Sequence, residues 1–225
     1  MEIRFDPALV EEAVFLELKA RQALGDAGTA QAFRAQWDAV YETALTQQDR
    51  DAGFERIARR FFLDFGFAEL IESRFLEFPL LQQVPLAVAR RVWSRKEERV
   101  ELYVTSIASE TMSGDLPAKS VLLALMPQRC VERDQTVAFL RSELMHISDM
   151  LDSAVAYEPH PAFGGECETE NDLIRERFRL LWNVWVAGRM RRNGWPLPEA
   201  EQSRRGLDQA FASWEPKRRE AVLQD

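Results

Sequence analysis

The chain has 225 residues, of which 46% are hydrophobic and 29% are charged, and its formal net charge at pH 7 is -8. This composition is that of an ordinary globular protein and excludes a chain that stays disordered for lack of apolar residues. The negative charge argues against nonspecific binding to nucleic acid or to an anionic membrane surface, because both need a basic protein surface.

Cysteine usage and hydropathy bear on the compartment. Cys130 and Cys167 are too few for a disulfide framework, and neither belongs to a CxxC pair. The N-terminal segment 1–6 is charged, and no stretch approaches the ~18 apolar residues that cross a bilayer. We therefore expect a cytoplasmic protein with no secretion signal and no membrane insertion.

Helical patterns dominate the N-terminal part. Asp6 followed by Pro7 is an N-cap with proline at the first helical position, so a helix is expected to run from there to Gly25. Apolar residues at helical spacing predict a second helix over about 29–47.

The next segments predict more helix and then strands. Residues 51–78 are rich in phenylalanine at helical spacing, interrupted at Gly66 and closed by Pro79, which predicts one bent helix or two shorter ones. Segments 100–107 and 120–126 are rich in strand-forming residues. They predict a small antiparallel sheet.

The C-terminal part returns to helix. Helices are expected over about 134–152 and 171–192, the second ending at Gly194, and a last helix is expected from near Pro198. A loop over 157–165 lies between the first two. The fold class predicted from the whole pattern is mainly α with a small antiparallel β-sheet, an α+β fold.

The most informative segment is residues 142–146, which reads S-E-L-M-H. At 100° per residue, Ser142, His146 and Asp149 lie within about 60° of one another on one helical face, and Glu143 flanks that face. A polar face with a histidine, a carboxylate and an adjoining glutamate is a candidate catalytic or metal-binding site.

This segment resembles the motif helix of the zincin metallopeptidases. In that family an H-E-x-x-H helix places two imidazoles one turn apart on zinc, and the glutamate deprotonates the metal-bound water. The present sequence is similar to the motif at Glu143 and His146. It departs from it at Ser142, the position of the first ligand.

A wider segment is similar to a set of bacterial metallopeptidases. There H-E-L-M-H-I-x-D-M-L-D is followed by an aromatic loop with proline, and a later helix reads L-W-D-x-x-x-D-G-R-L. Residues 181–190 here read L-W-N-V-W-V-A-G-R-M, so Asn183 and Ala187 replace aspartates as Ser142 replaces histidine. The resemblance covers 100–194 and implies that Ser142, His146 and Asn183 face one another in one cleft.

The resemblance also implies a division of the chain and further candidate ligands. Residues 1–98 would form an N-terminal helical region and 99–225 a zincin-like region of sheet, motif helix and packed downstream helix, together one compact domain. Asp149 could bind metal or orient the imidazole. Additional candidates for metal binding are Asp152, Asn183 and His160.

Three interpretations remain open at this point. Because Ser142, Asn183 and Ala187 are poor zinc ligands or none, the first is a pseudopeptidase that binds a protein or peptide partner and has no cofactor. The second is a divergent, active zinc-dependent metallohydrolase with His146 and carboxylates on zinc and Glu143 as general base. The third is an unrelated helical interaction domain.

Overall fold

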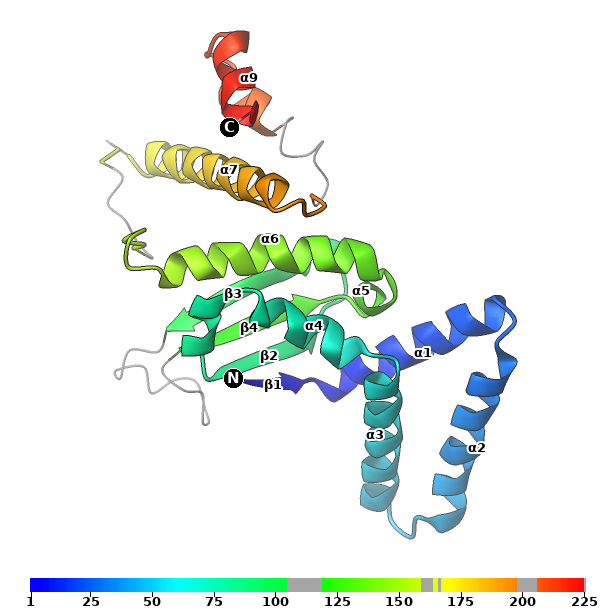
Figure 1. The fold of residues 1–225 in the computed structure, drawn as a ribbon. Coiled ribbons are helices and arrows are strands. Elements are labelled where there is room, and N and C mark those ends of the chain that lie inside the picture. Colours follow the sequence, from blue (N-terminus) through cyan, green and yellow to red (C-terminus); the bar gives the residue numbers. More distant parts are fainter. Residues whose placement is uncertain (105–118, 159–163, 166, 198–205, 225) are drawn as a thin grey trace. The chain divides into compact units, whose positions relative to one another are not determined.

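The computed structural model describes residues 1–104, 119–158, 164–165, 167–197 and 206–224. It is mainly helical with one small sheet (Figure 1), which confirms the predicted fold class. Contacts divide the chain into two units, Met1–Val137 and Ala138–Asp225, which we call the sheet unit and the helical unit. None of the helices in the described ranges is long and apolar enough to cross a membrane.

The sheet has four strands in the order β1-β2-β4-β3. Strand β1 pairs in parallel with β2, β2 pairs in parallel with β4, and β3 is antiparallel to β4. Strand β4 is one of the two inner strands and is buried at most positions, as expected for a strand with a neighbour on each side. The strands span Glu2–Phe5 (β1), Leu86–Arg91 (β2), Arg99–Val104 (β3) and Lys119–Leu125 (β4).

The antiparallel pair predicted from the sequence is confirmed as β3 and β4, within the described residues 99–104 and 119–125. The sheet is mixed, however, because β1 and β2 add two parallel pairings that the sequence reading did not anticipate. The helices that separate β1 from β2 allow this parallel pairing, which needs a long crossover connection. Two strands of the sheet therefore precede residue 98 in the sequence and two follow it, although the sequence analysis expected the sheet to belong to the region 99–225.

Local signals explain the first two helices, α1 (Pro7–Ala23) and α2 (Ala27–Thr43). The Asp6 carboxylate accepts the N–H of Ala8, and proline stands at the start of α1, as predicted. Helix α2 ends four residues earlier than expected. Thr46 and Asp49 form a capping box that starts the next helix instead.

The phenylalanine-rich segment forms two helices, α3 (Gln47–Asp64) and α4 (Phe67–Leu76), as one of the two predicted alternatives had it. Gly66 separates them with a φ of 74°, a left-handed conformation that glycine adopts at little cost. A 3₁₀ turn, η1 (Pro79–Gln83), then leads toward β2. Phenylalanines from α2, α3 and α4 form much of the core of the sheet unit, together with apolar residues of α1.

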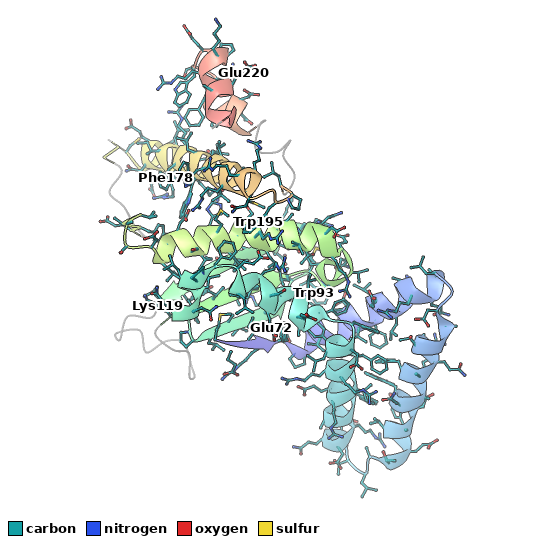
Figure 2. All side chains as sticks on the ribbon, in the orientation of Figure 1. Glu72, Trp93, Lys119, Phe178, Trp195 and Glu220 are labelled. Atoms are coloured by element: carbon teal, nitrogen blue, oxygen red, sulfur yellow. The ribbon has the colours of Figure 1, made fainter. Side chains whose placement is uncertain are left out.

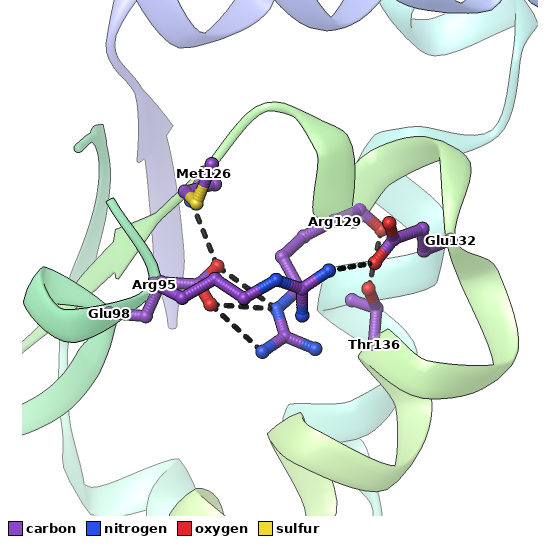
Figure 3. A network of polar contacts seen from close by, with 6 residues as sticks. All are labelled: Arg95, Glu98, Met126, Arg129, Glu132 and Thr136. Carbon is purple, nitrogen blue, oxygen red and sulfur yellow. Dashed lines mark hydrogen bonds and ion pairs between the residues drawn. The ribbon is translucent and has the colours of Figure 1, made fainter. Parts of the chain in front are cut away.

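A buried carboxylate ties the loops beside the sheet together (Figure 3). Glu98 follows the 3₁₀ turn η2 (Arg95–Glu97) and its side chain is 2% exposed. It accepts the backbone N–H of Met126 at 3.1 Å and two N–H groups of Arg129, which belongs to the short helix α5 (Gln128–Val131). Beside it, Arg95 donates to the more exposed Glu132.

Three helices are described in full or nearly so in the C-terminal part: α6 (Arg133–Leu151), α7 (Glu168–Arg192) and α9 (Pro216–Gln224). Helix α6 matches the predicted 134–152 closely. Gly194, with a φ of 67°, follows the end of α7 as expected. The expected start of the last helix, near Pro198, lies outside the described residues. The boundary between the two units falls within α6.

Candidate functional site

Helix α6 carries the S-E-L-M-H segment on a half-buried face. Leu140, Leu144 and Ile147 are buried, whereas Ser142 and His146 are half-buried. Asp149, one turn after His146, is 5% exposed and is one of the few buried polar residues in the described part of the chain. A carboxylate buried to this extent needs partners, because an unpaired charge is costly to remove from water.

Helix α7 supplies those partners within the helical unit. Trp182 Nε1 donates to Asp149 Oδ2 at 2.8 Å, and Arg189 Nη2 donates to the same oxygen. The side chain of Asp149 is 7% exposed and that of Arg189 28% exposed, so the ion pair is largely shielded from solvent. Arg189 and Trp182, which the sequence analysis did not name as candidate site residues, are thus the two partners of Asp149 on α7.

His146 contacts the same stretch of α7. Its ring meets the Trp182 ring edge to face, with centroids 4.8 Å apart and an interplanar angle of 86°. A side-chain hydrogen bond joins His146 to Asn183. Asn183 therefore lies beside the His146 imidazole, and Ser142 lies one turn before His146 on α6.

The protonation state of His146 follows from these surroundings. Burial lowers its pKa from 6.5 to about 4, which the nearby Asp149 charge and the hydrogen bond with Asn183 oppose, while the Arg189 charge lowers it further. The imidazole is thus neutral at pH 7. A neutral imidazole is the form that binds metals, but this one stands in the field of a permanent cation.

Aromatic residues surround the polar group. The rings of Tyr157 and Phe178 lie 5.8 and 5.9 Å from that of Trp182. Trp185, one turn further along α7, is 56% exposed, and the guanidinium groups of Arg189 and Arg192 lie 5.8 and 5.5 Å from its ring centroid. Phe178, labelled on α7 in Figure 2, is 52% exposed.

The remaining predicted residues are placed as follows. Glu143 is half-buried on α6, and Ala187 is half-buried on α7. Asp152 accepts the backbone N–H of Ala154 at 2.9 Å, so its carboxylate stabilises the turn after α6. His160 and residues 159–163 of the predicted aromatic loop lie outside the described residues.

The donor set can be compared with what a zinc site requires. A catalytic zinc takes three protein ligands, usually histidine, cysteine, aspartate or glutamate. Within the described residues, no three such side chains come together in a way that could hold a metal ion. On the motif helix, His146 interacts with the side-chain amide of Asn183, and Asp149 already accepts hydrogen bonds from Arg189 and Trp182.

Comparisons of the chain with protein-family models, with curated proteins and with solved structures gave no match. The resemblance to the zincins accordingly rests on the motif residues.

Proposed function

We propose that this chain is a metallopeptidase-like protein without catalytic activity, in which Ser142, Asn183 and Ala187 stand at the family's ligand positions and hold no metal ion, and the helical unit binds a protein or peptide. The observation that carries the proposal is that the side chains nearest to His146 at the family's ligand positions are Asn183, which interacts with the imidazole, and Ser142, one turn before it on α6, and both are poor zinc ligands. The resemblance expects Asp149 to hold or orient a ligand of zinc. Here Trp182 and Arg189, which match the family pattern, already bind that carboxylate.

Electrostatics support this assignment. Arginine keeps its charge at any ordinary pH, so the guanidinium is a permanent cation at the site. Its charge already reaches His146, whose pKa it helps to lower. A zinc ion placed on His146 would find no second imidazole at Ser142 and no carboxylate at Asn183, and Asp149 is already paired with Arg189. The site is therefore proposed to bind no zinc tightly and to need no cofactor.

The exposed surface of α7 supports a binding role. Trp185 and Phe178 are more than half exposed, and Arg189 and Arg192 lie against the Trp185 ring. Tryptophan, phenylalanine and arginine are enriched where proteins bind one another, and a few such residues carry most of the binding energy. We assign this patch, Phe178, Trp185 and Arg192, to contact with a protein or peptide partner, in the cytoplasm.

Zinc titration tests the lost site. Calorimetry against a competing chelator would compare wild type with Ser142→His, Asn183→Asp and the double variant, each with and without Arg189→Met. Wild type is expected to take up no tight zinc. The double variant should gain affinity non-additively because its new ligands share one ion, and Arg189→Met should increase that gain. Tight stoichiometric zinc in wild type would overturn the proposal.

Activity measurements test the absence of catalysis. Wild type and Glu143→Gln would be incubated with zinc and a mixture of peptides, and new termini would be identified by mass spectrometry. General bases contribute about 10²- to 10⁴-fold to rate, so an active zincin would lose its cleavage products in the variant. We expect no zinc-dependent products from either protein. Cleavage by wild type that Glu143→Gln abolishes would establish the active alternative.

Binding needs a matched pair of tryptophan variants. Trp185→Ala should lose the partners that wild type retains on affinity capture with quantitative mass spectrometry, whereas Glu143→Gln should keep them. Trp93→Ala is the control, because Trp93 is also strongly exposed, at 73%, but belongs to the sheet unit. Equal loss in both tryptophan variants, or none in Trp185→Ala, would contradict the assignment of the α7 patch.

A further inference from the structure

A cavity lies in the sheet unit, and the residues that line it, between Phe15 and Asp38, are far in sequence from the motif helix. Its volume is about 390 Å³, and α1 and α2 border it. Helix α1 contributes Phe15, Leu18 and Lys19, and α2 contributes Phe33 and Trp37. On each helix these residues recur at three- and four-residue spacing, so a single face of each helix lines the cavity. The volume is in the range that proteins use for small molecules.

The floor of the cavity is aromatic. The rings of Phe33 and Trp37 stack with centroids 5.1 Å apart at 28°, and Phe15 meets both edge to face at 5.5 and 5.8 Å. Phe33 is buried, but Phe15 remains 46% exposed. Trp37 also stacks on Phe54, with centroids 4.3 Å apart at 17°. The apolar surface that the cluster presents to solvent is therefore mainly that of Phe15, and it favours a flat apolar molecule that covers this ring.

Two cations line the same cavity, one from each helix. Lys19 on α1 and Arg34 on α2 are exposed, and neither makes an ion pair with any carboxylate in the described part of the chain. Arg21, two residues after Lys19, shows the contrast: it pairs with Glu17 at 2.8 Å. In a chain with a net charge of -8, two uncompensated cations beside an apolar cavity favour an anion there.

One acidic side chain also lines the cavity. Asp38 lies one turn after Arg34 on α2, beyond Trp37. It does not neutralise Arg34 through an ion pair within the described residues. A ligand whose anionic group lies between Lys19 and Arg34, with its apolar body over Phe33, would keep its charge away from this carboxylate.

We propose that the cavity between α1 and α2 is a binding site for a small organic anion with a flat apolar body, a carboxylate or sulfonate that Lys19 and Arg34 recognise. The rings of Phe15, Phe33 and Trp37 hold its apolar part. This site is independent of the function proposed for the helical unit, because it uses no residue of α6 or α7.

Two fluorescent probes with the same aromatic body test the proposal. Anilinonaphthalene sulfonate carries the anionic group, and phenylnaphthylamine lacks it. Both are titrated into the full chain, with wild type compared with Lys19→Gln/Arg34→Gln. We expect wild type to bind the sulfonate with one site and roughly tenfold more tightly than the neutral probe. The double variant should lose about that factor for the sulfonate alone, in line with two partly exposed ion pairs.

The control changes net charge equally elsewhere in the sheet unit. Arg56→Gln/Lys96→Gln removes two exposed cations that do not line the cavity, and it should leave both affinities unchanged. Unchanged binding of the neutral probe by the Lys19→Gln/Arg34→Gln variant shows that the cavity is still formed. Equal affinity of wild type for both probes, or an equal loss in the two double variants, would overturn the proposal. The cavity would then be apolar surface with no preference for an anion.

Discussion

Glu98 in the sheet unit and Asp149 in the helical unit are both buried carboxylates paired with an arginine, but the two ion pairs have different effects on their surroundings. Glu98 is paired with Arg129 and also accepts a backbone N–H, and its bonds join loops beside the sheet. Asp149 is paired with Arg189 and accepts an indole N–H, and its charge acts on a neutral histidine. The first network fixes the backbone. The second fixes the charge and hydrogen bonds of side chains on the motif face.

The largest effect on stability is expected at Glu98. Glu98→Ala leaves Arg129, whose side chain is only 13% exposed, without its carboxylate and leaves the N–H of Met126 without its acceptor. Breaking a buried ion pair on one side costs about 3 to 5 kcal/mol, so the free energy of unfolding from urea titration should fall by about that amount. Glu132→Gln is the control, at about 1 kcal/mol or less, because Glu132 is 34% exposed. Equal losses of unfolding free energy in the two variants would show that the buried Glu98 contributes no more to stability than the more exposed Glu132.

A smaller loss is expected at Asp149. Asp149→Ala should lower the free energy of unfolding by about 2 to 3 kcal/mol, less than a fully buried pair, because Arg189 is 28% exposed and can turn toward water. Adding Arg189→Met should recover part of this loss, since the unpaired charge is then gone. If the double variant is no more stable than Asp149→Ala, the unpaired charge of Arg189 does not account for the stability that Asp149→Ala loses.

His146, beside Asp149 in the helical unit, should make the stability of the protein depend on pH. Folded His146 resists protonation down to its pKa of about 4, whereas in the unfolded chain it protonates near 6.5. The unfolded state therefore binds the extra proton first, and stability is lost as the pH falls through this window. Between pH 7 and pH 5 the loss from His146 is about 2 kcal/mol. His146→Gln should flatten the profile of unfolding free energy by that amount, and a slope identical to that of wild type would contradict the half-buried, neutral imidazole.

The smallest effect is expected at the indole of Trp182. Trp182→Phe keeps most of the aromatic contact with His146 but removes one hydrogen bond to Asp149, whose ion pair with Arg189 remains. The loss should be about 1 kcal/mol in urea titration. Trp185→Phe on the same helix is the matched control, because that ring is 56% exposed, and its unfolding free energy should stay near that of wild type.

Part of the candidate site could be predicted from the sequence. The spacing of Ser142, His146 and Asp149 follows from helical geometry alone. The resemblance added the expectation that Asn183 lies near His146, with which it interacts in the structure. The partner of Asp149 could not be predicted in this way. Arg189 belongs to a basic run at the end of α7, where arginines ordinarily complement the helix dipole. Only the packing of α7 against α6 shows that this one enters the ion pair.

The sequence by itself determined the local structure. The Asp6 cap, the break at Gly66 and the end of α7 before Gly194 all depend on neighbouring residues, whose preferences a short segment expresses. The strand-forming residues of β3 and β4 likewise predict each strand by itself.

The tertiary structure decided what depends on residues far apart in the chain. The parallel pairing of β1 with β2 joins Glu2 to Leu86, and Asp149 meets Arg189 forty residues later. Short strands such as β1 carry little periodicity, and a carboxylate can pair with any of many arginines. Burial selects among these pairings, because a backbone edge or a charge removed from water must find a partner wherever the fold provides one.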